Sequence, residues 1–97
     1  AYVFYFIEAM TEAGIEMGLA PDQAQRLAIG TFTGASALAD SAHEPPAVLR
    51  ERVTSKGGTT YAAISTLQQA DVKGQFKTAI RAAQKRAAEL GEEFGRG

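Results

Sequence analysis

The chain is divided by one stretch, Val53-Thr54-Ser55-Lys56-Gly57-Gly58-Thr59-Thr60, in which two adjacent glycines lie between small hydroxyl residues. Residues 61–67, which follow it, contain few helix breakers and predict the beginning of a helix. A helix start leaves backbone N–H groups without partners, and the helix dipole adds partial positive charge there. Glycines let an anion approach the backbone, and nearby hydroxyls add donors. The stretch therefore predicts either a plain turn before a helix or a cradle for a small anion such as a carboxylate.

A phosphate-binding P-loop is excluded by the order of the residues. In the Walker pattern, Gly-Lys-Ser/Thr ends a longer loop that directly follows a buried strand. Here Lys56 precedes the two glycines, and residues 46–52 before the stretch are charged and predict a helix instead of a strand.

The residues around this stretch resemble the signature of the pyrroline-5-carboxylate reductase family. The similar run is Ala47-Val48-Leu49-Arg50-Glu51-Arg52-Val53-Thr54-Ser55-Lys56-Gly57-Gly58-Thr59-Thr60-Tyr61-Ala62-Ala63-Ile64. The opening Ala1-Tyr2-Val3-Phe4 is similar to the start of that family's C-terminal helical domain, so the resemblance covers essentially all 97 residues. One position departs from the pattern, because many members have proline where this chain has Lys56.

The resemblance implies a function for the chain. Members of the family reduce 1-pyrroline-5-carboxylate to L-proline in proline biosynthesis, using NADPH or NADH held by a separate Rossmann domain. Their helical domain forms the dimer interface and the substrate pocket. We therefore expect residues 1–97 to be a single helical dimerisation and substrate-binding domain without the N-terminal Rossmann domain, inactive alone. We expect an interlocked homodimer or a higher homo-oligomer.

The resemblance also implies roles for the residues of the glycine stretch. The amides of Gly57, Gly58 and Thr59, together with Ser55, would hold the substrate carboxylate. Thr60 would hydrogen-bond the ring nitrogen. A protonated cyclic imine is already a good hydride acceptor, so the protein would mainly orient it. No residue of this chain is expected to be catalytic, to bind the cofactor or to ligate a metal.

Composition supports a single globular domain with no broad affinity for nucleic acid or membranes. The 97 residues suffice for one modest core, with 45% apolar and 22% charged residues. A net charge of −1 gives no general attraction to nucleic acid or to anionic lipid. The absence of cysteine excludes disulfides and Cys/His zinc sites, and it is compatible with the cytoplasmic location that we expect. The longest uncharged run near the middle, residues 27–39, is too short to span a bilayer.

The periodicity of the sequence predicts an all-α fold of five helices, because no segment alternates with the period of a strand. Gly18 is expected to end the first helix, Pro21 to begin the second and Asp71 to cap the last. His43 is expected to lie in an exposed loop. The expected helices cover residues 1–18, 21–40, 47–53, 59–70 and about 72–94.

The faces of these helices indicate where packing is expected. The aromatic residues at the start of the chain are predicted to be core, and Gly30 and Gly34 to let another helix approach closely. The second helix is expected to bury its larger positions, Leu27, Phe32, Ala35 and Leu38. The last helix carries a narrow apolar stripe made of Phe76, Ile80, Ala83, Ala87, Leu90 and Phe94. It also carries a basic line, interpreted as a solvated face and made of Lys73, Lys77, Arg81 and Lys85.

Three other interpretations stay open at this point. The first is the helical domain of another dehydrogenase family, but such domains usually present a lysine on a helix, whereas Lys56 lies in a loop. The second is a non-enzymatic dimerisation module in which the glycine stretch is only a turn. The third, a nucleic-acid binder, is disfavoured by the net charge.

Overall fold

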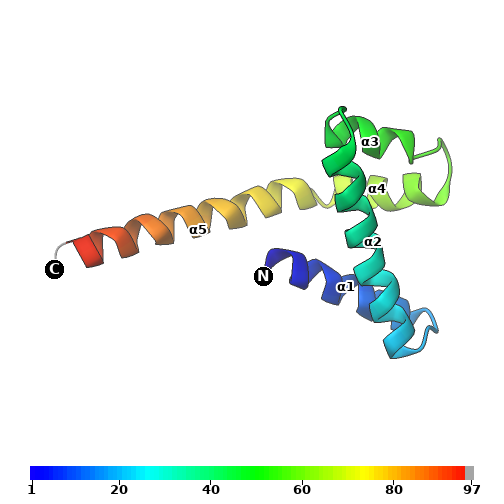
Figure 1. Ribbon diagram of the computed structural model, residues 1–97, viewed down its shortest axis with the longest axis horizontal. Helices are drawn as coiled ribbons and strands as arrows, with labels where there is room; N and C mark the ends of the chain where they lie inside the picture. The colour runs from blue at the N-terminus through cyan, green and yellow to red at the C-terminus, as the bar shows by residue number, and fades with distance from the viewer. Residues whose placement is uncertain (96–97) are drawn as a thin grey trace. The chain divides into compact units, whose positions relative to one another are not determined.

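The computed structural model describes residues 1–95, which form five α-helices and no strand (Figure 1). The helices are α1 (Tyr2–Glu16), α2 (Pro21–Ser41), α3 (Pro46–Arg52), α4 (Thr59–Gln69) and α5 (Val72–Gly95). Each end lies within two residues of the expected one, so the predicted all-α fold is confirmed. None of the helices in the described residues has the length and apolarity needed to cross a membrane.

The chain divides into two compact units between Arg50 and Glu51, near the end of α3. Residues 1–50 contain α1, α2 and most of α3, while the residues from Glu51 onward contain the glycine stretch, α4 and α5. Within the first unit α1 packs on α2, and within the second α4 contacts α5.

Local backbone signals fix the turn between α1 and α2. Gly18 has φ +105° and its N–H donates to the carbonyl of Ile15 at 3.0 Å, while the N–H of Leu19 donates to the carbonyl of Gly14 at 3.0 Å. This is the Schellman arrangement, which favours glycine because of the positive φ. Pro21 then occupies the first turn of α2, where its missing N–H costs nothing. Both predicted boundary residues are confirmed.

Helix α1 packs on α2 (Figure 1), and small side chains near that turn allow the close approach. A Cβ placed on Gly14 would lie 3.2 Å from the Cβ of Ala24, so the two backbones approach closely there. Ala24 and Ala28 are the buried residues of α2, whereas Leu27 and Leu38 are 56% and 53% exposed. The expectation that α2 buries its larger residues is therefore wrong within this chain, because the face of α2 that meets α1 is the alanine face.

Large apolar residues remain exposed on the first unit. Phe4 and Tyr5 are exposed, and Tyr5 meets the edge of Phe6 with ring centroids 5.9 Å apart. The aromatic start of the chain is thus not a core of this chain, contrary to the prediction. Nothing in the described residues lies within 4 Å of a Cβ placed on Gly30 or Gly34, so no helix of the same chain uses these glycines for close packing.

Asp71 begins α5 as the sequence predicts. Its carboxylate accepts a hydrogen bond of 3.2 Å from the N–H of Gly74, which satisfies one of the free amides of the first turn. Asp71 has φ +50°, a backbone conformation that aspartate tolerates better than most residues. A Cβ on Gly74 would collide with the Asp71 carboxylate, so glycine makes room for the cap.

Candidate functional site

The glycine stretch forms a tight turn directly before α4. The N–H of Gly58 donates to the carbonyl of Ser55 at 3.0 Å, and Gly57, the third residue of the turn, has φ +76°. Lys56, the second residue, does not have a positive φ. This combination is the pattern of a type II turn, in which the third position requires glycine or asparagine.

Proline, the residue from which Lys56 was noted to depart in the sequence analysis, suits this position, because the second position of a type II turn favours proline. In addition, the Lys56 N–H donates no hydrogen bond within the described chain. We expect Lys56→Pro to raise the free energy of unfolding by about 0.4–1 kcal/mol, since proline removes freedom from the unfolded chain. Urea unfolding at one fixed protein concentration measures this, with Lys56→Ala as the control that removes only the charge. A loss of stability in the proline variant would show that residue 56 does not adopt the conformation inferred here.

Gly58 is the residue that joins the turn to the helix. It has φ −86° and ψ −178°, and its carbonyl accepts the first hydrogen bond of α4, from the N–H of Ala62 at 3.1 Å. A Cβ on Gly58 would lie 2.5 Å from Ser55 Oγ and 3.3 Å from the Ser55 carbonyl oxygen. The absence of a side chain at Gly58 therefore lets the Ser55 hydroxyl lie beside the start of α4.

Three backbone amides at the start of α4 have no partner. Thr59, Thr60 and Tyr61 are the first three residues of the helix, and no side chain caps it. The N–H groups of these three residues also donate to no backbone carbonyl outside the helix within the described residues. Free amides and the helix dipole together place partial positive charge at this point. The one charged side chain in residues 54–61, Lys56, has the same sign.

This arrangement differs from the expected one at two positions. The Gly58 amide, expected to face an anion, is instead engaged by the Ser55 carbonyl in the turn. The amide of Tyr61 is free, and sequence reasoning missed it. The predicted start of the helix at Thr59 was the signal that would have found Tyr61, because the first three residues of any helix have free amides.

Two threonine hydroxyls at the start of α4 are also available to a ligand. Further along the same helix, the hydroxyl of Thr66 donates to the carbonyl of Ala62 at 2.9 Å. The side chains of Thr59 and Thr60 are exposed and make no such bond within the described chain. With Ser55, these residues surround the free amides with hydroxyl groups that can donate or accept.

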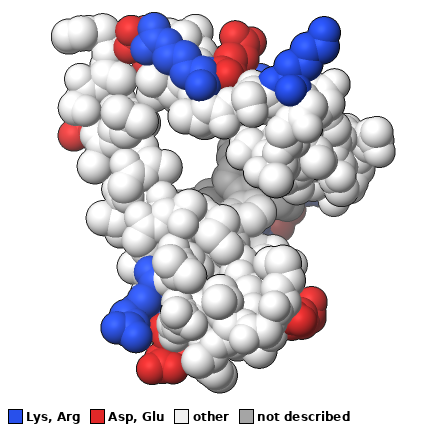
Figure 2. All heavy atoms as spheres, turned by 90° about the vertical axis from the view of Figure 1, so that its right-hand side faces the viewer, with Lys and Arg blue, Asp and Glu red and all other residues white. Residues whose placement is uncertain are grey.

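Other chemistry has little support in the described residues. They contain no group of three or more His, Cys, Asp and Glu side chains placed to hold a metal ion. His43 is exposed in its loop, as predicted. Figure 2 shows acidic as well as basic side chains among uncharged ones.

The fold and this site define an all-α domain in which a glycine turn leads into a helix whose first backbone amides are free within the described residues. Its sequence matches the family described as "Pyrroline-5-carboxylate reductase dimerisation" over residues 1–90. The chain therefore belongs to the pyrroline-5-carboxylate reductase family, and the resemblance noted in the sequence is confirmed.

Individual relatives agree with this assignment. The chain is 44% identical over 95 residues to a pyrroline-5-carboxylate reductase of Pseudomonas aeruginosa, covering 98% of this chain and 35% of the relative. It is 39% identical over 92 residues to one of Corynebacterium melassecola, covering 95% of this chain and 34% of the relative. The chain thus spans about a third of the length of the curated relatives that it matches.

Solved structures of the same family share the fold. A pyrroline-5-carboxylate reductase of Coxiella burnetii has a TM-score of 0.88 and 38% identity, covering 92% of this chain and 33% of that one. The Plasmodium falciparum enzyme, solved with NADP bound, has a TM-score of 0.82 and 28% identity, covering 84% of this chain and 31% of that one.

Proposed function

We propose that this chain is the dimer-forming and substrate-binding part of an enzyme that reduces 1-pyrroline-5-carboxylate to L-proline with NADPH or NADH. The observation that carries the proposal is the set of free amides at the start of α4, reached across a glycine with no side chain. Membership of the reductase family supports the choice of a substrate that carries a carboxylate. Free amides occur at the start of any helix, so what favours a ligand over a plain turn here is the hydroxyl groups of Ser55, Thr59 and Thr60 in the same short stretch.

The substrate carboxylate binds at the helix start. The N–H groups of Thr59, Thr60 and Tyr61 donate to its oxygens, and the helix dipole stabilises its charge. The Ser55 hydroxyl, which lies beside the same point, supplies a further donor. Gly58 leaves room for that hydroxyl, because a Cβ there would lie 2.5 Å from Ser55 Oγ.

The ring nitrogen of the substrate lies near the Thr60 hydroxyl. The oxygen of that hydroxyl accepts a hydrogen bond from the N–H of the protonated imine, and it has no competing bond within the described chain. Two anchored groups fix the orientation of a small planar ring, so the chain contributes positioning and not proton transfer.

The nicotinamide cofactor is held mainly outside this chain, which carries no dinucleotide-binding motif of its own. The described residues contain no strand, and the sequence has no G-x-G-x-x-G turn between a strand and a helix. When bound, the cofactor supplies the hydride, and we assign its binding to a separate Rossmann domain of the enzyme.

Titration of the isotopically labelled 97-residue chain with L-proline, the reaction product, tests the site by NMR. We expect the largest amide shifts at Thr59, Thr60 and Tyr61, with those of α1 unchanged. Glycine amide, which lacks a carboxylate, is the control ligand and should leave these amides unmoved. If proline moves no amide near the turn, the stretch is only a turn and the chain is better explained as a dimerisation module without a substrate site.

We also propose that the chain forms an obligate, interlocked homodimer. Apolar residues are exposed on both units, and Phe4 and Phe94 are 69% and 80% exposed. Exposed apolar surface beyond a few hundred Å² usually marks an interface. We expect the dimer to bury more than ~2,000 Å², as permanent partners do. Light scattering at micromolar concentration measures the mass, and a well-folded monomer there would contradict the proposal.

A further inference from the structure

Lys56 is the single charged residue in the stretch 53–70. The sequence of α4 contains no charged residue, and the nearest acidic residue along the chain, Glu51, lies between two arginines. Lys56 is exposed and forms no ion pair within the described residues. Its positive charge is therefore not offset by any side chain of its own turn or of the helix that follows.

The glycine turn holds this charge close to the start of α4. Lys56 is the second residue of the turn that the bond between the Gly58 N–H and the Ser55 carbonyl closes at 3.0 Å. Because consecutive Cα atoms are about 3.8 Å apart, the Cα of Lys56 lies within about 11 Å of that of Thr59. The flexible four-carbon stem of lysine lets the ammonium group approach more closely. Charges interact over about 10 Å at 0.1 M ionic strength, so the field of Lys56 extends to the free amides.

On grounds of stability, lysine is a poor choice for this position. The free N–H groups of Thr59, Thr60 and Tyr61 and the helix dipole already place partial positive charge there, and a cation near a helix N-terminus is unfavourable. Proline would also suit the second position of the turn better. A bound carboxylate reverses the electrostatic balance, because both the helix start and Lys56 attract it.

We propose that Lys56 is a positioning residue that draws the substrate carboxylate to the start of α4. This inference rests on the proposed function and adds a residue to the proposed carboxylate site. The ammonium group acts as a mobile point charge, so it strengthens the binding of an anion without a fixed hydrogen-bond geometry. It takes no part in proton or hydride transfer. The turn is then less rigid than proline would make it, and its field for anions is stronger.

The charge of the ligand decides how strongly Lys56 acts on it. Cyclopentanecarboxylate is a five-membered ring with one negative charge and no nitrogen, so it experiences the full attraction. L-Proline carries an ammonium group in the same ring, and the repulsion of that group by Lys56 partly cancels the attraction of the carboxylate. Lys56 therefore favours a ring carboxylate with a net negative charge over a zwitterion.

NMR titration of the labelled 97-residue chain with these two ligands tests the inference. At 0.1 M ionic strength, we expect Lys56→Gln to raise the dissociation constant of cyclopentanecarboxylate about two- to fivefold and that of L-proline by less. At 1 M, where charges interact over only about 3 Å, the variant and the wild type should bind equally. Lys56→Arg keeps the charge and should bind as the wild type does at both salt concentrations.

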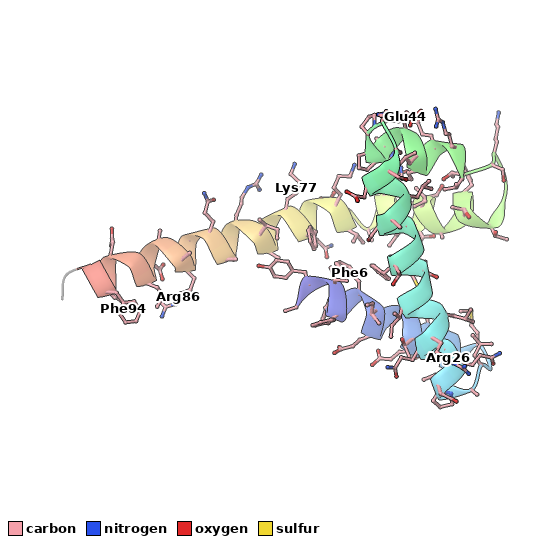
Figure 3. The ribbon with its side chains drawn as sticks, viewed as in Figure 1. Phe6, Arg26, Glu44, Lys77, Arg86 and Phe94 are labelled. Atoms are coloured by element: carbon pink, nitrogen blue, oxygen red, sulfur yellow. The ribbon has the colours of Figure 1, made fainter. Side chains whose placement is uncertain are left out.

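Lys77→Gln is the matched control, because it removes one positive charge at a distance from the turn. Lys77 extends outward from α5 (Figure 3), and the whole of α4, about 16 Å of helix, separates the turn from the start of α5. That separation exceeds the range of about 10 Å at 0.1 M ionic strength. We expect Lys77→Gln to leave both dissociation constants unchanged.

Lys56→Pro separates the effect of charge from that of turn rigidity. This variant is expected to be more stable than the wild type, yet to bind cyclopentanecarboxylate as weakly as Lys56→Gln does at 0.1 M ionic strength. A purely structural role for residue 56 would instead make the more stable proline variant bind at least as tightly as the wild type.

The outcomes separate this inference from the proposed function. If neither ligand moves the amides at the start of α4 in the wild-type chain, the proposed carboxylate site is wrong, and the role of Lys56 with it. If the wild-type chain binds cyclopentanecarboxylate and Lys56→Gln binds it equally well at 0.1 M ionic strength, only the role of Lys56 is overturned. A weakening that persists unchanged at 1 M also overturns that role, because the side chain would then act through the shape of the turn.

Discussion

Replacing Thr60 with valine is expected to lower kcat/KM for 1-pyrroline-5-carboxylate roughly ten- to hundred-fold in an enzyme that contains this chain. Valine keeps the shape and the β-branching and deletes one hydroxyl. If that hydroxyl bonds the charged imine nitrogen, its loss costs about 1.5–3 kcal/mol, the range for hydrogen bonds to charged groups. Steady-state kinetics with varied substrate measures the effect.

The same helix provides the control for this substitution. Thr66→Val also deletes one threonine hydroxyl of α4, but that hydroxyl is already satisfied by the Ala62 carbonyl. We expect it to leave kcat/KM unchanged. Thr60→Val should change neither stability nor dimerisation much, because the Thr60 side chain is exposed and makes no bond within the described chain. Wild-type kinetics in Thr60→Val with the dimer intact would mean that Thr60 only begins the helix.

The helices were predictable because their ends are coded locally. The positive φ of Gly18, the proline at position 21 and the Asp71 cap each act within a few residues of themselves. No information about the rest of the fold is needed to place such boundaries. The same holds for the helix start at Thr59, since the Gly-Gly pair fixes it from within the turn.

The candidate site was predictable in position but not in detail. The sequence indicates that a glycine turn meets a helix, and therefore that free amides gather there. Which amides are free depends on the turn type, and that follows from the φ of Gly57 and from the bond between Gly58 and Ser55. These are properties of the folded backbone. The sequence alone therefore predicts the Gly58 amide as a donor to the carboxylate and does not single out the amide of Tyr61.

The packing of α2 could not be predicted from residue size. Leucine is normally the better core residue, yet Ala24 and Ala28 are buried and Leu27 and Leu38 are exposed. The approach of α1 at Gly14 selects the alanine face, because only small side chains fit where two backbones come close. Hydrophobic pattern alone does not distinguish a face that packs within the chain from one that packs on a second copy.

Gly58→Val is expected to raise KM for 1-pyrroline-5-carboxylate by at least about tenfold while lowering kcat less, because it blocks carboxylate binding and leaves the Thr60 hydroxyl in place. The new Cβ would lie 2.5 Å from Ser55 Oγ and 3.3 Å from the Ser55 carbonyl oxygen, so the Ser55 side chain must rotate away or the turn must shift slightly. In the proposed binding mode, the added methyl groups also hinder the approach of the carboxylate to the free amides. Initial rates over a range of substrate concentrations separate KM from kcat.

A second substitution distinguishes a blocked site from a damaged turn. Ser55→Ala removes the oxygen that meets the new Cβ, so adding it to Gly58→Val should restore much of any lost stability. Ser55→Ala leaves in place the new side chain at position 58, which still covers the amides. It also deletes one proposed hydrogen-bond donor, so KM should stay high or rise further. If the double variant regains both the wild-type stability and the wild-type KM, the rise in KM caused by substituting Gly58 results only from a distorted turn. The carboxylate then does not bind at the start of α4.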